Sequence, residues 1–90
     1  MIFMIRIKIL GGGCAECRQL HDMVKEVLED MDLLGQVSLD WTNNHREITA
    51  YGVMMTPGLV INGLVRSVGE VPAAEEIRGW LEPLATGHFV

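Results

Sequence analysis

Two cysteines spaced three positions apart are the residues of this chain best suited to chemistry. Cys14 and Cys17 are its only cysteines, and three consecutive glycines precede them. If a helix begins at Ala15, Cys14 lies at its N-terminal edge and Cys17 one turn further, so the two sulfurs can share a disulfide bond or a metal ion. The pair is therefore either a redox couple or a carrier site for a soft metal such as Cu(I) or Zn.

The position of the pair predicts different roles for the two thiols. Unpaired amide groups at a helix N-terminus favour the thiolate, so we expect Cys14 to be the nucleophile. Cys17, one turn deeper and shielded by the helix, is expected to attack the resulting mixed disulfide. Glu16 places a negative charge beside the nucleophile and should oppose formation of the thiolate.

Composition restricts the class of protein. The 90 residues, with 49% hydrophobic and 21% charged side chains, predict one globular domain over residues 1–90, with a core over 4–84 and a frayed tail at 85–90. Such a domain needs no disulfide for stability, and we expect a monomer. A net charge of −5 argues against nucleic acid and anionic membranes as partners.

The N-terminal run MIFMIRIKIL is apolar, but Arg6 and Lys8 interrupt it and no small-residue cleavage site follows. No apolar stretch of about 20 residues is present either. These patterns predict a cytoplasmic protein, where thiols are kept reduced and a cysteine pair is more often catalytic or metal-binding than structural. No phosphate-binding loop with a following lysine occurs, so no nucleotide or other organic cofactor is expected.

Hydrophobic periodicity predicts the elements around the cysteines. Residues 4–10 alternate as a strand, residues 15–31 have apolar positions at helical spacing, and residues 37–41 alternate again. A helix between two strands implies a parallel, right-handed crossover. The cysteines therefore lie within a β-α-β pattern, which favours the redox interpretation of their spacing.

The second half of the chain predicts a helix, a hairpin and a last helix. Asn44 and Glu47 resemble a capping box that begins a short helix ending near Tyr51. Asn62-Gly63 between residues 58–61 and 64–68 is a strong hairpin signal. After Pro72 the inward positions of the last helix are apolar, although Gly79 costs about 1 kcal/mol within a helix. The inward side chains are those of Ile77, Trp80, Leu81 and Leu84.

The resulting order, β-α-β-α-β-β-α with a Cys-x-x-Cys after the first strand and a Thr-Pro before the third, resembles the thioredoxin fold. More closely, the chain is similar to small archaeal and bacterial thioredoxin-like proteins called redox-active disulfide proteins. The matching segments are IRIKILGGGCAEC, Val24-Lys25-Glu26, EITAYGVMMTPGLVINGLV and VGEVPAAEEIRGWL, which together cover most of residues 4–83. The resemblance implies an α/β domain with a four-stranded mixed sheet flanked by helices.

The resemblance also implies a function and further site residues. Proteins of this family exchange a dithiol for a disulfide in other proteins, and a flavin-dependent reductase supplies their electrons. The proline of the Thr-Pro pair is cis in the family and stands beside the cysteines, so Pro57 and Thr56 are expected to contact the substrate chain. Met55 is expected on the rim of that groove, and Gly13 leaves space for a partner to approach Cys14.

Some residues depart from the family pattern or support the metal alternative. Ala15-Glu16 replaces the usual proline-containing dipeptide, and no acid on the first strand could act as a buried base. Lys8 is the nearest candidate for proton transfer or charge support, although its expected role is to cover a solvated face. His21 could join both cysteines as a third metal ligand, although a histidine on a charged helix is usually only solvated. The two tryptophans, Trp41 and Trp80, are expected to pack.

Overall fold

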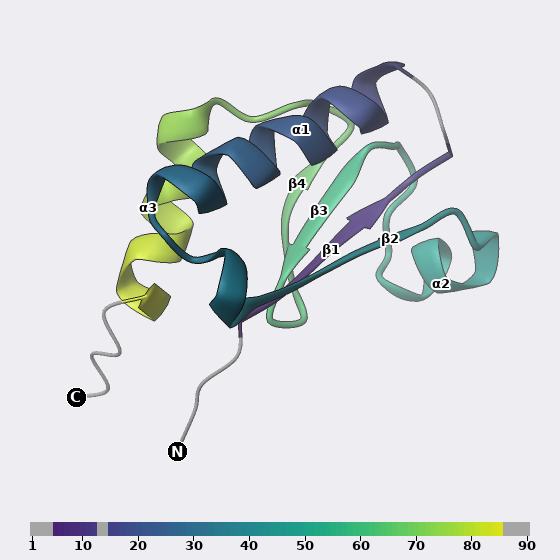
Figure 1. Cartoon of the computed structure of the whole chain (residues 1–90). Helices are drawn as coiled ribbons and strands as arrows, with labels where there is room; N and C mark the ends of the chain where they lie inside the picture. The colour runs from purple at the N-terminus through teal and green to yellow at the C-terminus, as the bar shows by residue number, and fades with distance from the viewer. Residues whose placement is uncertain (1–4, 13–14, 86–90) are drawn as a thin grey trace.

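The computed structural model describes residues 5–12 and 15–85. Along the chain, the order of elements confirms the predicted β-α-β-α-β-β-α arrangement (Figure 1). A short 3-10 helix before the second strand was not predicted, and Ala85, expected in the tail, ends the last helix. Met4 and residues 86–90 lie outside the described residues. The elements are β1 (Ile5–Leu10), α1 (Ala15–Asp30), η1 (Leu34–Gln36), β2 (Val37–Thr42), α2 (His45–Ala50), β3 (Gly58–Ile61), β4 (Leu64–Val68) and α3 (Ala74–Ala85).

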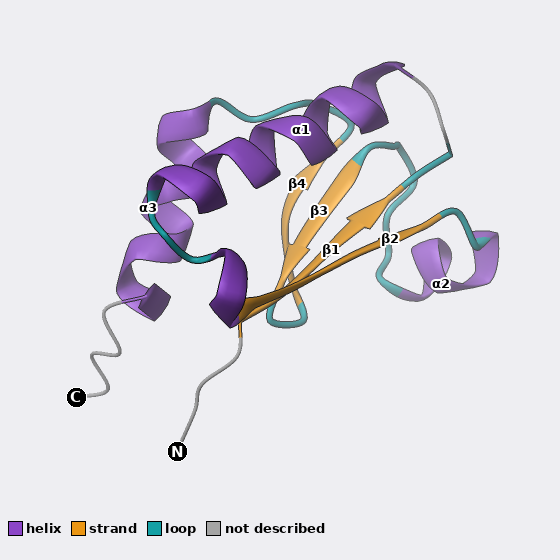
Figure 2. Cartoon of the chain, in the orientation of Figure 1, coloured by secondary structure: helices purple, strands orange, loops and turns teal. Residues whose placement is uncertain are grey.

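The four strands form one mixed sheet in the order β2-β1-β3-β4 (Figure 2). β1 runs parallel to β2, as expected for strands joined by a helix, and antiparallel to β3. β3 and β4 form the predicted hairpin, in which Asn62 and Gly63 both have positive φ, 51° and 83°. The backbone N–H of Asn62 donates to the carbonyl of Arg6, so the turn is also tied to β1.

Helices α1 and α3 pack on one face of the sheet (Figure 1). The alternation in β1 places three isoleucines on this face, and α1 contributes the apolar positions of its helical repeat. Trp80 packs against this cluster from α3, as predicted. The buried members from these elements and from β3 are Ile5, Ile7, Ile9, Leu20, Val24, Val27, Leu28, Leu59, Ile61, Ile77 and Leu81.

The short helix α2 covers part of the opposite face. Ile48 and Val53 pack there against Leu10 and Val60. The side-chain oxygen of Asn44 accepts hydrogen bonds from the backbone N–H groups of Arg46 and Glu47, which confirms Asn44 as the N-cap. None of the helices in the described part of the chain has both the length and the apolar character needed to cross a bilayer.

Candidate active site

Cys17 lies in the first turn of α1, and its exposed fraction is 0%. Its sulfur packs against the backbone of Gly11, the residue that follows β1. A Cβ atom at Gly11 would stand 2.5 Å from Cys17 Sγ, closer than side chains can approach. The φ angle of Gly11, +152°, is also one that other residues rarely adopt. Glycine at position 11 is therefore what allows the sulfur to occupy this position.

The Thr56-Pro57 segment approaches the same point from the start of β3. Its peptide bond is cis, as the family resemblance implies. A Cβ atom at Gly11 would lie 3.2 Å from Thr56 Cβ, so Gly11 contacts both the cysteine and the threonine. Pro57 is buried and Thr56 is exposed, and the Pro57 carbonyl accepts a 2.8 Å hydrogen bond from the backbone N–H of Gly69. Three segments distant in sequence thus converge at Cys17.

Two methionines form an exposed apolar surface next to this segment. Met54 is 89% exposed and Met55 is 63% exposed. Met55 leans against Gly69, because a Cβ atom there would come within 3.2 Å of Met55 Cβ. Since methionine is flexible and adapts its shape readily, two adjacent exposed methionines can serve as a contact surface for an extended chain.

Trp41 and His21 border the site on the side of β2. The indole Nε1–H of Trp41 donates a 2.9 Å hydrogen bond to the carbonyl of Gly11. The ring stacks on His21, one turn beyond Cys17 in α1, with centroids 5.3 Å apart and planes 27° from parallel. Trp41 was predicted to pack, and it packs on this histidine while remaining 37% exposed.

The described residues cannot test the predicted metal set as a whole, because that set includes Cys14. Among residues 5–12 and 15–85, no cluster of three or more His, Cys, Asp or Glu side chains could hold a metal ion. His21 faces the ring of Trp41, and its Nδ1 lies 3.4 Å from the carboxylate of Asp22. Cys14 and Gly13 lie outside the described residues, so a metal site that includes Cys14 stays a prediction.

Lys8 belongs to the opposite face of the sheet. Its ammonium forms an ion pair with Glu47 and lies 5.8 Å from the centre of the Tyr51 ring. The hydrogen bond between the two side chains raises the pKa of Lys8 and lowers the pKa of Glu47. The Glu47 carboxylate therefore binds Lys8. In a capping box it would instead accept a hydrogen bond from the backbone N–H of Asn44, but that N–H donates to Thr42 Oγ1. The predicted capping box is therefore wrong for Glu47.

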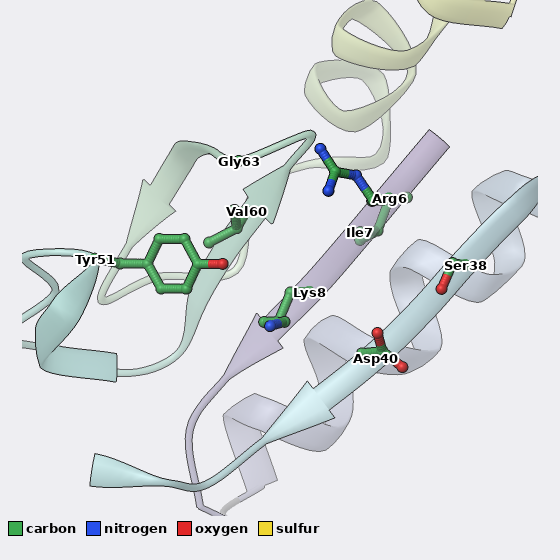
Figure 3. Close-up of a pocket in the computed structure, with 8 residues that line it drawn as sticks. All are labelled: Arg6, Ile7, Lys8, Ser38, Asp40, Tyr51, Val60 and Gly63. Atoms are coloured by element: carbon green, nitrogen blue, oxygen red, sulfur yellow. The ribbon is translucent and has the colours of Figure 1, made fainter. Parts of the chain in front are cut away.

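A pocket of about 280 Å³ opens beside Lys8 (Figure 3). Arg6, Asp40 and Tyr51 also line it, and β1 separates these side chains from the isoleucine face on which α1 packs. The pocket is therefore distinct from the cysteine site, and Lys8 is placed away from Cys17.

Comparison with known proteins agrees with this geometry. Residues 5–82 match the family model described as "Thioredoxin domain". The chain belongs to the thioredoxin family. Two thioredoxin-family relatives, each named "Thioredoxin", come from Methanocaldococcus jannaschii and Methanothermobacter thermautotrophicus. The first is 29% identical over 84 residues, covering 93% of this chain and 94% of the relative. The second is 28% identical over 75 residues, covering 83% of this chain and 95% of the relative.

The structure places four of the predicted site residues near one another: Cys17, Thr56, Pro57 and Met55. Two contributors were not predicted as site residues. Gly11 was named only as one of the three glycines before Cys14, and Trp41 only as a packing residue. The three glycines gave a partial signal for the first, because a run of glycines marks a close approach of the backbone. The hydrogen bond of Trp41 joins residues 30 positions apart and had no sequence signal.

Proposed function

We propose that this thioredoxin-family protein exchanges its Cys14–Cys17 dithiol for disulfide bonds in client proteins. The supporting observation is the burial of Cys17 in the first turn of α1, where Gly11 contacts both the Cys17 sulfur and Thr56 of the cis Thr56-Pro57 segment. A shielded second thiol beside a backbone segment that a substrate chain can reach is what a two-step exchange requires.

The exchange proceeds in two balanced steps. The Cys14 thiolate attacks one sulfur of the client disulfide, a Cys14–client bond forms, and the other client sulfur leaves as a thiolate. Cys17 loses its proton to solvent and attacks the Cys14 sulfur. The Cys14–Cys17 disulfide forms, the second client sulfur leaves, and both client thiolates take up protons. The protein is oxidised by two electrons and the client is reduced by two.

The client would bind as an extended chain beside Thr56 and Pro57. Met54 and Met55 supply an exposed apolar surface there, and Gly13 is proposed to leave room above Cys14. We further propose that the protein acts as a monomer in the cytoplasm, where the reducing environment keeps the pair as a dithiol. A flavin-dependent reductase is the proposed electron donor.

A redox titration tests the proposal directly. The purified protein is equilibrated with thiol buffers of known potential and a chelator, its free thiols are alkylated, and the products are weighed by mass spectrometry. We expect a reversible two-electron transition between roughly −180 and −280 mV, with loss of two alkylation sites. The opposite outcome is that the thiols stay reduced throughout while the protein carries one Zn or Cu(I) when the chelator is omitted. That result would contradict disulfide exchange and indicate that the protein is a metal carrier.

Two variants assign the sulfurs. Cys14→Ser should abolish reduction of a protein disulfide such as that of insulin, while the fold remains. Cys17→Ser should still attack but should remain joined to the client, because no second thiol releases it. A Cys14→Ser protein that reduces insulin at the wild-type rate would contradict the proposed role of Cys14.

A further inference from the structure

Trp41 fixes the backbone against which the Cys17 sulfur packs. In the sheet, Trp41 stands beside Ile9, so its side chain lies on the same face as α1. Both backbone groups of Gly11 are bonded to the end of β2: its N–H donates to the carbonyl of Thr42 at 2.9 Å, and its carbonyl accepts from the Trp41 indole at 2.9 Å. Gly11 is therefore held at two points.

The contacts continue from Gly11 to the sulfur. The Gly11 Cα is close enough to Cys17 Sγ that an added Cβ would stand 2.5 Å from the sulfur. The same Cβ would stand 3.2 Å from Thr56 Cβ. Because the interior is packed at this point, a shift of Gly11 changes the space available to the sulfur. A series of contacts thus runs from Trp41 through Gly11 to Cys17.

Core packing does not account for this placement of the tryptophan. Within the described residues, the two apolar clusters are assembled without Trp41, and its ring is 37% exposed. The indole N–H of Trp41 instead donates a hydrogen bond to the carbonyl of Gly11, the residue that contacts the sulfur.

We propose that Trp41 is a positioning residue that, through Gly11, holds the Cys17 sulfur in place for its attack on the mixed disulfide. This inference rests on the proposed function. The attack is intramolecular, so its rate depends on the alignment of the sulfurs already present in the mixed disulfide, and a small displacement lowers that rate. Attack by Cys14 on an external disulfide does not use the Cys17 sulfur and should be insensitive to the same change.

Stopped-flow reaction of the reduced protein with a limiting amount of dithiobis(nitrobenzoate) separates the two steps. Attack by Cys14 releases one coloured thiolate in a concentration-dependent phase. Attack by Cys17 on the Cys14 sulfur releases the second in a concentration-independent phase and forms the Cys14–Cys17 disulfide. Both phases are measured for the wild type, Trp41→Phe and Trp80→Phe, the last being a matched loss of a tryptophan from α3.

We expect Trp41→Phe to slow the second phase roughly threefold to tenfold, the factor that corresponds to the net worth of one hydrogen bond. Its first phase and both phases of Trp80→Phe should stay close to wild type. Equal second phases in the wild type and Trp41→Phe would overturn the positioning role. A wild type that releases no second coloured thiolate would instead overturn the proposed role of Cys17. Failure of the positioning role and failure of the proposed function are therefore distinguishable.

A second replacement covers the case in which Trp41→Phe does not fold. In the Trp80→Phe background, Trp41 is replaced by benzothienylalanine, which keeps the bicyclic ring and its stacking on His21 but has sulfur in place of the ring N–H. The second phase should again slow relative to Trp80→Phe. An unchanged second phase in this protein would show that the indole hydrogen bond does not position the sulfur.

Discussion

Gly11 and Cys17 are in direct contact, with the glycine Cα against the cysteine sulfur so closely that a Cβ atom would stand 2.5 Å from Sγ. The contact joins the end of β1 to the first turn of α1. It makes the backbone at position 11 part of the environment of the sulfur that is proposed to complete disulfide exchange.

Gly11→Ala should destabilise the reduced protein by about 1–3 kcal/mol, because the added methyl group overlaps the sulfur and the backbone angle disfavours alanine. Urea unfolding of the reduced protein measures this loss. Gly12→Ala is the matched control, because a Cβ atom there meets no atom of residues 5–12 or 15–85 within 4 Å. Equal destabilisation by both substitutions would contradict a specific role for the Gly11–Cys17 contact.

Met55→Ser should raise the KM for reduction of a protein disulfide roughly threefold to tenfold, because it removes exposed apolar surface of about one side chain from the client contact. Its first-phase rate with dithiobis(nitrobenzoate) should not change, since that reagent is too small to need the surface. Steady-state reduction of insulin provides the KM. Leu64→Ser is the control, since Leu64 is also exposed but lies at the hairpin end of β4. A similar rise in KM for both variants would argue against the methionine surface.

Glu47→Gln should lower the melting temperature at pH 7 and lower it less near pH 3. The hydrogen bond from Lys8 lowers the pKa of Glu47 below its ordinary 4.5, so its stabilisation is present above that pH and is lost as pH falls through the folded-state pKa. The same hydrogen bond raises the pKa of Lys8 above its ordinary 10.5. The stabilisation by the Lys8 ammonium is therefore present below that pH and is lost as pH rises through the folded-state pKa of Lys8.

Thermal unfolding of Glu47→Gln across this pH range is compared with Glu26→Gln, which alters an exposed carboxylate of α1. The Glu26 variant should show no such pH-dependent difference from wild type. A Glu47 effect of equal size at pH 3 and pH 7 would mean that the carboxylate charge is not its source.

Gly79→Ala should stabilise the protein by about 0.5–1 kcal/mol, because alanine restricts the unfolded chain and favours the helix. Gly79 lies within α3, and a Cβ atom there meets nothing within 4 Å in the part of the chain that the structure describes. Gly58→Ala should have the opposite sign, since its Cβ atom would lie 3.3 Å from Leu10 and Val53 side chains. Urea unfolding distinguishes the two, and a loss of stability in Gly79→Ala would contradict the open site seen on α3.

The elements of this fold were predictable where neighbours along the chain decide the conformation. Asn44 caps α2, and Asn62-Gly63 turns between β3 and β4, because each depends on contacts or backbone angles within a few residues. The alternation in β1 and the helical repeat of α1 likewise indicated the face that each element buries. Those local patterns were sufficient for the order of elements, and the Cys-x-x-Cys and Thr-Pro motifs within that order added the resemblance to the family.

The surroundings of Cys17 depended on tertiary structure. Gly11, Trp41 and Thr56 meet because β2 lies beside β1 and because the segment before β3 returns to the same end of the sheet. The partner of Glu47 was decided in the same way, since Lys8 becomes available only when α2 packs on the sheet. The residues able to do chemistry, and the elements that carry them, could be read from the order of residues along the chain. The side chains around the sulfur could not, because contacts between residues 30 or more positions apart form only when the folded chain packs, and no local pattern encodes them.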